Sequence, residues 1–77
     1  MYEMEKTVYF SDMQDVREFV NAADNCDFDI DVYYKRAVID AKSILGMLAI
    51  GLKQRVIVRY GGKNEQFENV IQKYATA

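Results

Sequence analysis

Residues 28–40 read FDIDVYYKRAVID, and the first seven alternate apolar with mostly polar side chains. Such alternation is typical of a strand with one buried face, because successive side chains point to opposite faces of a sheet. We therefore expect a strand over 28–34 and a short strand over 37–40. The Lys35-Arg36 pair between them is an unusual hairpin turn, since two-residue turns favour Asn-Gly or another glycine pair. The sequence predicts backbone strain there, or a longer loop.

Upstream of this hairpin, residues 6–10 are β-branched and aromatic, which predicts another strand. Ser11, followed by Gln14 three residues later, matches a capping box and predicts a helix from about residue 12 to about residue 23. The apolar stripe expected to face the core consists of Met13, Val16, Phe19, Val20 and Ala23.

Downstream, Ser43 predicts the N-cap of a short helix over 44–50, with Gly51 as its C-terminal cap. A last strand alternates up to the Gly61-Gly62 break, and Asn64 then caps a last helix. The apolar side chains of this strand and helix are Val56, Val58, Tyr60, Phe67, Val70, Ile71 and Tyr74.

The resulting order, β-α-β-β-α-β-α, predicts one α+β domain over residues 1–77, with the helices on one face of an antiparallel sheet. We expect the other face to be wet and to carry Asp29, Asp31, Arg55 and Arg59. Residues 1–34 are acidic and residues 35–63 are basic. Because the net charge is only -2, we expect these charges to neutralise each other within one fold.

The 77 residues include no histidine and one cysteine, Cys26. This composition excludes an imidazole base, a histidine metal ligand and an intrachain disulfide, so we expect no cofactor and no metal site. An acidic chain without a basic, aromatic patch is not expected to bind nucleic acid. The longest apolar run, 44–52, is too short to span a membrane, and no leader is visible. We expect a cytoplasmic protein with no membrane partner.

A helix over 44–50 that is apolar on every side cannot bury all its faces. We expect Ile44, Leu45 and Leu48 to form an exposed patch, which in a soluble protein indicates a site for a protein partner or for self-association. Ser43 at the helix N-cap is also well placed for phosphorylation, because a phosphate there would meet free N–H groups.

Four segments resemble HPr, the histidine-containing phosphocarrier protein of the sugar phosphotransferase system. They are 42–51 (KSILGMLAIG), 20–23 (VNAA), 29–32 (DIDV) and 60–65 (YGGKNE). The resemblance implies the HPr-like open-faced sandwich, a four-stranded antiparallel sheet with three helices on one face. It also implies that Ser43 is a regulatory phosphorylation site and that Ile44, Leu45 and Leu48 contact partners.

The chain departs from HPr where that family carries its phosphoryl-accepting histidine. Asp12 lies near the histidine position and Gln14 near the family arginine. The sequence is therefore similar to HPr relatives that lack the histidine, keep the serine, and act as partners of a transcription regulator. The resemblance implies a non-catalytic interaction protein that an HPr kinase modifies, not an enzyme. Two alternatives stay open: a phosphotransfer intermediate using Asp12, and a structural or oligomerising module.

Overall fold

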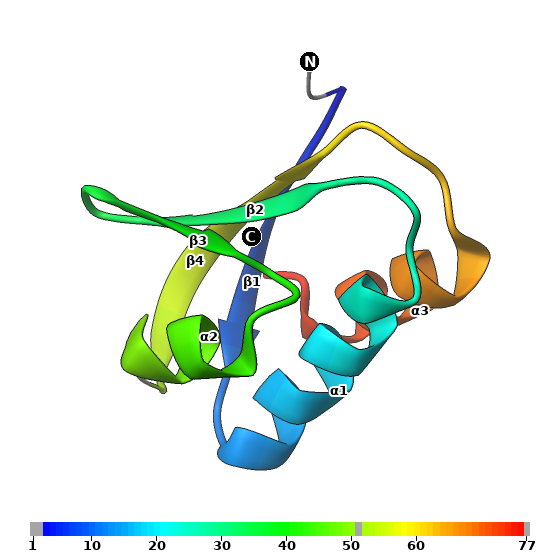
Figure 1. Ribbon diagram of the computed structural model, residues 1–77. Coiled ribbons are helices and arrows are strands. Elements are labelled where there is room, and N and C mark those ends of the chain that lie inside the picture. Colours follow the sequence, from blue (N-terminus) through cyan, green and yellow to red (C-terminus); the bar gives the residue numbers. More distant parts are fainter. Residues whose placement is uncertain (1–2, 51, 77) are drawn as a thin grey trace.

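The computed structural model describes residues 3–50 and 52–76, and its elements follow the predicted order. They are β1 (Met4–Phe10), α1 (Met13–Asp24), β2 (Ile30–Tyr34), β3 (Ala37–Asp40), α2 (Ile44–Ile50), β4 (Gln54–Tyr60) and α3 (Glu65–Tyr74). The strands form one antiparallel sheet in the order β1-β4-β2-β3. The three helices cover one face of this sheet (Figure 1). The predicted open-faced α+β sandwich is confirmed.

The core fills the space between the sheet and the helices. Alternate strand residues point into it, among them Ile30, Val32 and Val58, which are fully excluded from solvent. Phe19 of α1 and Phe67 of α3 meet there with ring centroids 5.7 Å apart. The helical stripes predicted from 3.6-residue spacing supply the facing layer, and their buried members are Val16, Phe19, Val20, Ala23, Phe67 and Ile71.

The start of α1 differs from the predicted capping box by one residue. Asp12, not Ser11, is the N-cap, and its Oδ1 accepts the Asp15 backbone N–H at 3.1 Å. The Asp15 carboxylate in turn accepts the N–H and the hydroxyl of Ser11. Met13, which was predicted to join the core stripe, is 46% exposed. It opens the first turn of α1, and the buried stripe of this helix starts one turn later, at Val16.

The outer face of the sheet is less polar than predicted. By alternation Asp31, Arg55 and Arg59 lie there, and the exposed Asp29 precedes β2. The register, however, also places a row of four uncharged side chains, three of them apolar or aromatic, across all four strands. The row consists of Thr7, Ile57, Tyr33 and Val38, and we call it the outer row. The sequence pattern missed it because its members come from four separate strands.

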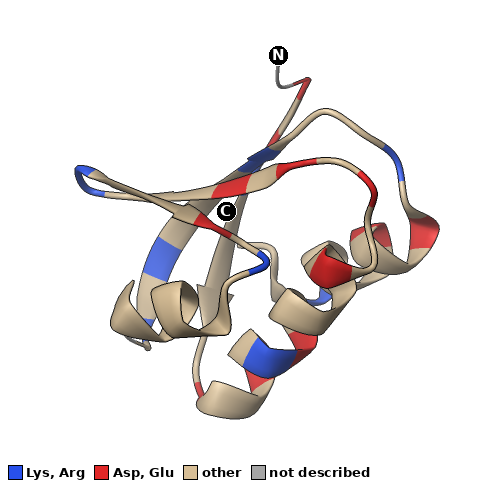
Figure 2. Ribbon diagram, viewed as in Figure 1, with Lys and Arg blue, Asp and Glu red and all other residues tan. Residues whose placement is uncertain are grey.

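Acidic and basic residues from distant parts of the chain meet on this same face (Figure 2). Arg59 Nε lies 2.7 Å from Glu5 Oε1, and the Arg59 guanidinium also stacks 4.8 Å from the centre of the Tyr33 ring. This ion pair joins the acidic first half of the chain to its basic middle. For Glu5 and Arg59, the expected pairing of opposite charges within one fold is confirmed.

The β2–β3 hairpin closes with a strained two-residue turn. Tyr34 pairs with Ala37, so Lys35 and Arg36 alone connect the strands. Lys35 has a φ of 53°, in the left-handed region that costs a side chain about 1–2 kcal/mol. The strain expected from the missing glycine is confirmed, and no longer loop forms. The predicted cap at Gly51 lies outside the described residues.

Replacing Lys35 with asparagine should stabilise the protein by about 0.5–1 kcal/mol, because asparagine tolerates the left-handed region. The gain is net of the lost contact between the Lys35 ammonium and the Tyr34 ring, 5.3 Å away. Urea unfolding of both proteins measures it. Arg36→Asn is the matched control, since Arg36 does not have a positive φ. Equal stability changes in the two variants would contradict the strain at Lys35.

Candidate functional site

Ser43 links β3 to α2, and its hydroxyl is committed to the start of the helix. Its Oγ accepts the Gly46 backbone N–H at 3.1 Å, and its carbonyl accepts the Met47 N–H at 2.9 Å. The Ser43 N–H donates to the carbonyl of Asp40 at 3.0 Å. Ser43 is nevertheless exposed, so a modifying enzyme could reach the hydroxyl. The predicted N-cap is confirmed.

Helix α2 presents one strongly exposed apolar side chain beside Ser43. Met47 is the one fully buried residue in 44–50, whereas Leu45 is 79% exposed. Ile44 and Leu48 are partly buried and pack against the core. The expected exposed patch is therefore centred on Leu45, and Ile44 and Leu48 contribute only their outer parts.

The close approach of α2 to β3 depends on Gly46. A Cβ atom at this position would lie 2.8 Å from Ile39 Cγ2, closer than carbon atoms can pack. Glycine therefore lets the helix rest on Ile39, at a cost of about 1 kcal/mol in helix propensity relative to alanine. This packing fixes which side of the short helix faces solvent.

A groove of about 440 Å³ runs between α1 and the start of α2. It is lined by Arg17, Val20, Asn21, Asp24, Lys42 and Ile44. Lys42 also donates from Nζ to the carbonyl of Cys26 at 2.9 Å, which holds this cation beside the groove. Sequence reasoning missed Arg17, Asn21 and Asp24. Their spacing of four and three residues marks one face of α1, but nothing local places α2 across from it.

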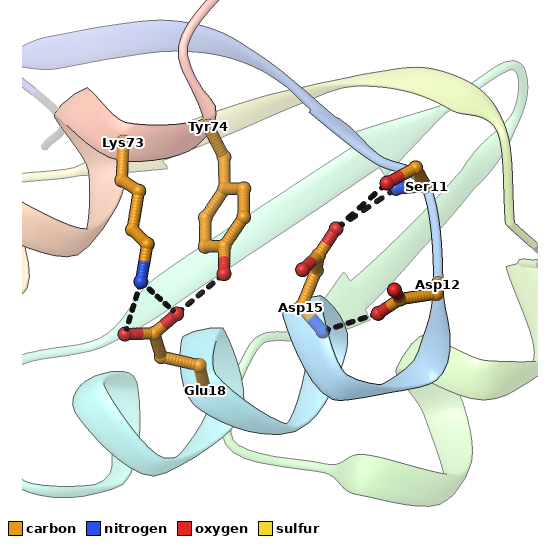
Figure 3. A network of polar contacts seen from close by, with 6 residues as sticks. All are labelled: Ser11, Asp12, Asp15, Glu18, Lys73 and Tyr74. Atoms are coloured by element: carbon orange, nitrogen blue, oxygen red, sulfur yellow. Dashed lines mark hydrogen bonds and ion pairs between the residues drawn. The ribbon is translucent and has the colours of Figure 1, made fainter.

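The start of α1 holds Asp12 and Gln14, the two residues that the sequence resemblance puts near the family histidine and arginine. Both are exposed, and Asp12 caps the helix as described above. Asp15, next along, belongs to a polar network that ties α1 to the end of α3 (Figure 3). There the Tyr74 hydroxyl donates to Glu18 Oε1, and Lys73 Nζ lies 2.9 Å from the same oxygen.

This network keeps two carboxylates ionised near the start of α1. Burial would raise the pKa of Asp15, but hydrogen bonds from the Ser11 N–H and hydroxyl, and from Tyr74, lower it below its usual value. Hydrogen bonds from Tyr74 and Lys73 lower the pKa of Glu18. Burial, together with the hydrogen bond to Glu18, raises the pKa of Tyr74. Glu18 is paired with Lys73, so the negative charge at the start of α1 comes from Asp12 and Asp15, and it disfavours an incoming phosphoryl group.

Neither the cysteine thiol nor the acidic side chains form a further reactive or metal-binding site in the described residues. Burial, with smaller contributions from Asp27 and Glu68, raises the pKa of the Cys26 thiol against the opposing charge of Lys42. A raised pKa leaves little thiolate, so Cys26 is a poor nucleophile. In the described ranges 3–50 and 52–76, no three cysteine or acidic side chains gather in an arrangement that could hold a metal ion.

Replacing Tyr74 with phenylalanine should raise the pKa of Glu18 toward its ordinary value of 4.5, because the main hydrogen bond to the carboxylate is lost. A carboxyl whose folded pKa is lowered contributes stability above its ordinary pKa and loses it as the pH falls. The variant should therefore lose less stability on acidification than the wild type. NMR titration of the side-chain carboxyl carbons measures the pKa.

Tyr34→Phe is the control for this experiment, because Tyr34 lies on β2 and its one described ring contact is with Lys35. Its Glu18 titration should match the wild type. An unchanged Glu18 pKa in Tyr74→Phe would contradict the role given to the hydroxyl.

Comparison with known proteins finds similar structures but no similar sequences. No protein-family model matches the chain, and no curated protein sequence matches it. Among solved structures, "HPr-C-His" from Thermoanaerobacter tengcongensis superposes with a TM-score of 0.72 and 21% identity, covering 91% of this chain and 92% of the other. The phosphocarrier protein HPr from Bacillus anthracis strain Ames gives a TM-score of 0.69 and 25% identity, covering 92% and 95%.

The chain therefore has an HPr-like fold over most of its length. Both superpositions extend over more than nine-tenths of each partner, so the likeness includes the sheet and the helical layer together. Within the described part of the chain, no helix has the length and apolar character needed to cross a membrane.

Proposed function

We propose that this protein is a non-catalytic, HPr-like regulatory protein related to the sugar phosphotransferase system, which binds protein partners in the cytoplasm and is switched by phosphorylation of Ser43. One observation carries the proposal: an exposed serine caps α2 directly beside Leu45, whose side chain is 79% exposed. A modifiable hydroxyl and an apolar anchor thus share one short helix. The likeness of the whole chain to solved HPr structures supports the link to the phosphotransferase system.

The start of α1 supports the non-catalytic part of the proposal. Asp12 serves there as a helix cap, and Asp15 is held ionised one turn away. An acyl phosphate on Asp12 would therefore form beside a second negative charge and would break the cap. This arrangement favours Ser43 over the alternative phosphotransfer role of Asp12.

The switch works by adding charge next to the apolar anchor. A phosphate on Ser43 adds about -1.5 to -2 charges and three acceptor oxygens beside Leu45. A partner with an arginine cluster and an adjacent apolar pocket would bind this combination more tightly than either part alone. The groove lined by Arg17 and Lys42 would give the same partner a second, polar contact. An HPr kinase is the expected modifying enzyme and a transcription regulator the expected reader.

Incubation with an HPr kinase/phosphorylase and ATP should place one phosphate on Ser43, because its hydroxyl is exposed in the HPr-like position. Mass spectrometry of tryptic peptides locates the phosphate. Ser43→Ala should take up none, and Ser11→Ala, which removes a hydroxyl bonded to Asp15, should be phosphorylated like the wild type. A phosphate retained in Ser43→Ala, or none in the wild type, would contradict the switch.

Leu45→Asp should weaken binding of the phosphorylated protein to a transcription regulator at least tenfold, which corresponds to ~1.4 kcal/mol. Isothermal titration calorimetry measures the affinity. Because Leu45 is so exposed, the free energy of unfolding should change by less than about 0.5 kcal/mol. Val38→Asp is the matched control, since Val38 is exposed on the opposite face of the sheet. Equal losses in both variants would argue against docking through α2.

A further inference from the structure

Strand β3 forms an open edge of the sheet. It is the last strand in the order β1-β4-β2-β3, and within residues 3–50 and 52–76 no strand pairs with its other side. Three of its four residues are exposed, and the β2–β3 hairpin extends beyond the helical layer (Figure 1). An open edge offers backbone N–H and C=O groups to another strand. The Asp40 carbonyl already accepts the Ser43 N–H, so the edge available for pairing ends before that carbonyl.

The outer row ends at this edge with an unusually exposed side chain. Val38 is 55% exposed, whereas Tyr33 and Ile57, farther into the sheet, are partly covered by their neighbours. An additional strand beside β3 would continue the row and cover Val38. Ile39, which points to the opposite face, already contacts α2, so the helical layer leaves the Val38 side uncovered.

The charges at the two ends of β3 favour a second copy of this chain as the added strand. The carboxylate of Asp40 keeps one oxygen available for this, because only Oδ1 accepts the Lys42 backbone N–H, at 2.9 Å. Arg36 ends the turn two residues before Val38, and Asp40 ends β3 two residues after it. In an antiparallel pair, residues directly opposite one another point to the same face. Pairing centred on Val38 therefore sets each Arg36 opposite Asp40 of the second copy, twice over, with the two Val38 side chains between them.

The neighbouring registers lack this complementarity. Pairing centred on residue 37 sets Arg36 opposite Val38, and pairing centred on residue 39 sets Val38 opposite Asp40, so neither brings Arg36 opposite Asp40. A shift of the pairing by one residue would set side chains of the solvent-facing side of the sheet opposite side chains that face the helices. This shift is excluded because the helix-facing side of each sheet is buried. Charge and side-chain pattern thus agree on a single register.

We propose that two copies associate through antiparallel pairing of β3 with β3, centred on Val38, to form one continuous eight-stranded sheet. The outer row then runs unbroken across both copies, and two ion pairs flank its centre. Because β3 has four residues, the interface is small and the association weak and concentration-dependent. The inference is independent of the function proposed for Ser43 and Leu45.

Sedimentation equilibrium over micromolar to millimolar concentrations tests the proposal. The wild type should show a monomer–dimer equilibrium, and Val38→Lys should weaken it at least about tenfold because like charges would meet at the two-fold axis. Leu45→Lys is the control, with the same new charge on α2, and should dimerise like the wild type. Circular dichroism confirms that each variant is folded.

A pair of charge-reversed variants tests the register. Arg36→Glu and Asp40→Lys should each be monomeric alone, because both would set like charges opposite one another. Their equimolar mixture should form a heterodimer, since Glu then faces Lys and Arg faces Asp. A wild type that stays monomeric throughout, a dimer lost in Leu45→Lys, or a mixture that fails to associate while both variants are folded would overturn the proposal.

Discussion

The architecture depends on the burial of Tyr60 at the end of the central strand β4. Its ring is fully excluded from solvent, stacks against Phe28, and meets Phe67 of α3 edge-on with centroids 5.1 Å apart. Its hydroxyl donates to Glu68 at 2.7 Å, so the one polar atom of this buried side chain is satisfied. Because β4 pairs with both β1 and β2, these contacts of Tyr60 anchor the centre of the sheet to α3. The same packing requires glycine at position 62, because a Cβ atom there would collide with the Phe28 ring that stacks on Tyr60.

The exposure of the Ser43 and Leu45 region is a consequence of where α2 lies. The helix has seven residues and rests on Ile39 of β3, the outermost strand, through Gly46. A short helix at the margin of a core buries one side only, so Met47 is covered and Leu45 faces solvent. The same marginal position leaves a groove toward α1 and an open strand edge. The exposed Leu45, the groove and the open strand edge therefore lie together on the β3 side of the sheet.

The start of α1 is organised around three carboxylates, in a chain that contains no histidine. Asp12 and Asp15 satisfy backbone N–H groups in the first turn and just before it. Glu18, one turn later, accepts hydrogen bonds from Tyr74 and Lys73 at the end of α3. These carboxylates stabilise the helix start and its contact with α3. The polar groups at this end of the molecule hold the start of α1 and its contact with α3, whereas the exposed Ser43 lies at the start of α2.

Local sequence determined the elements, their order and two of the caps, because strand alternation, helical spacing and side-chain capping act over a few residues. Ser43 and Asn64 both cap the helices that their positions predicted. The shift from Ser11 to Asp12 was a choice between adjacent polar residues that local pattern could not make. Tertiary structure alone decided the exposure of Met13, the groove beside Lys42 and the outer row ending at Val38. These depend on segments far apart in the chain, which only the packing of the helices and the register of the sheet bring together.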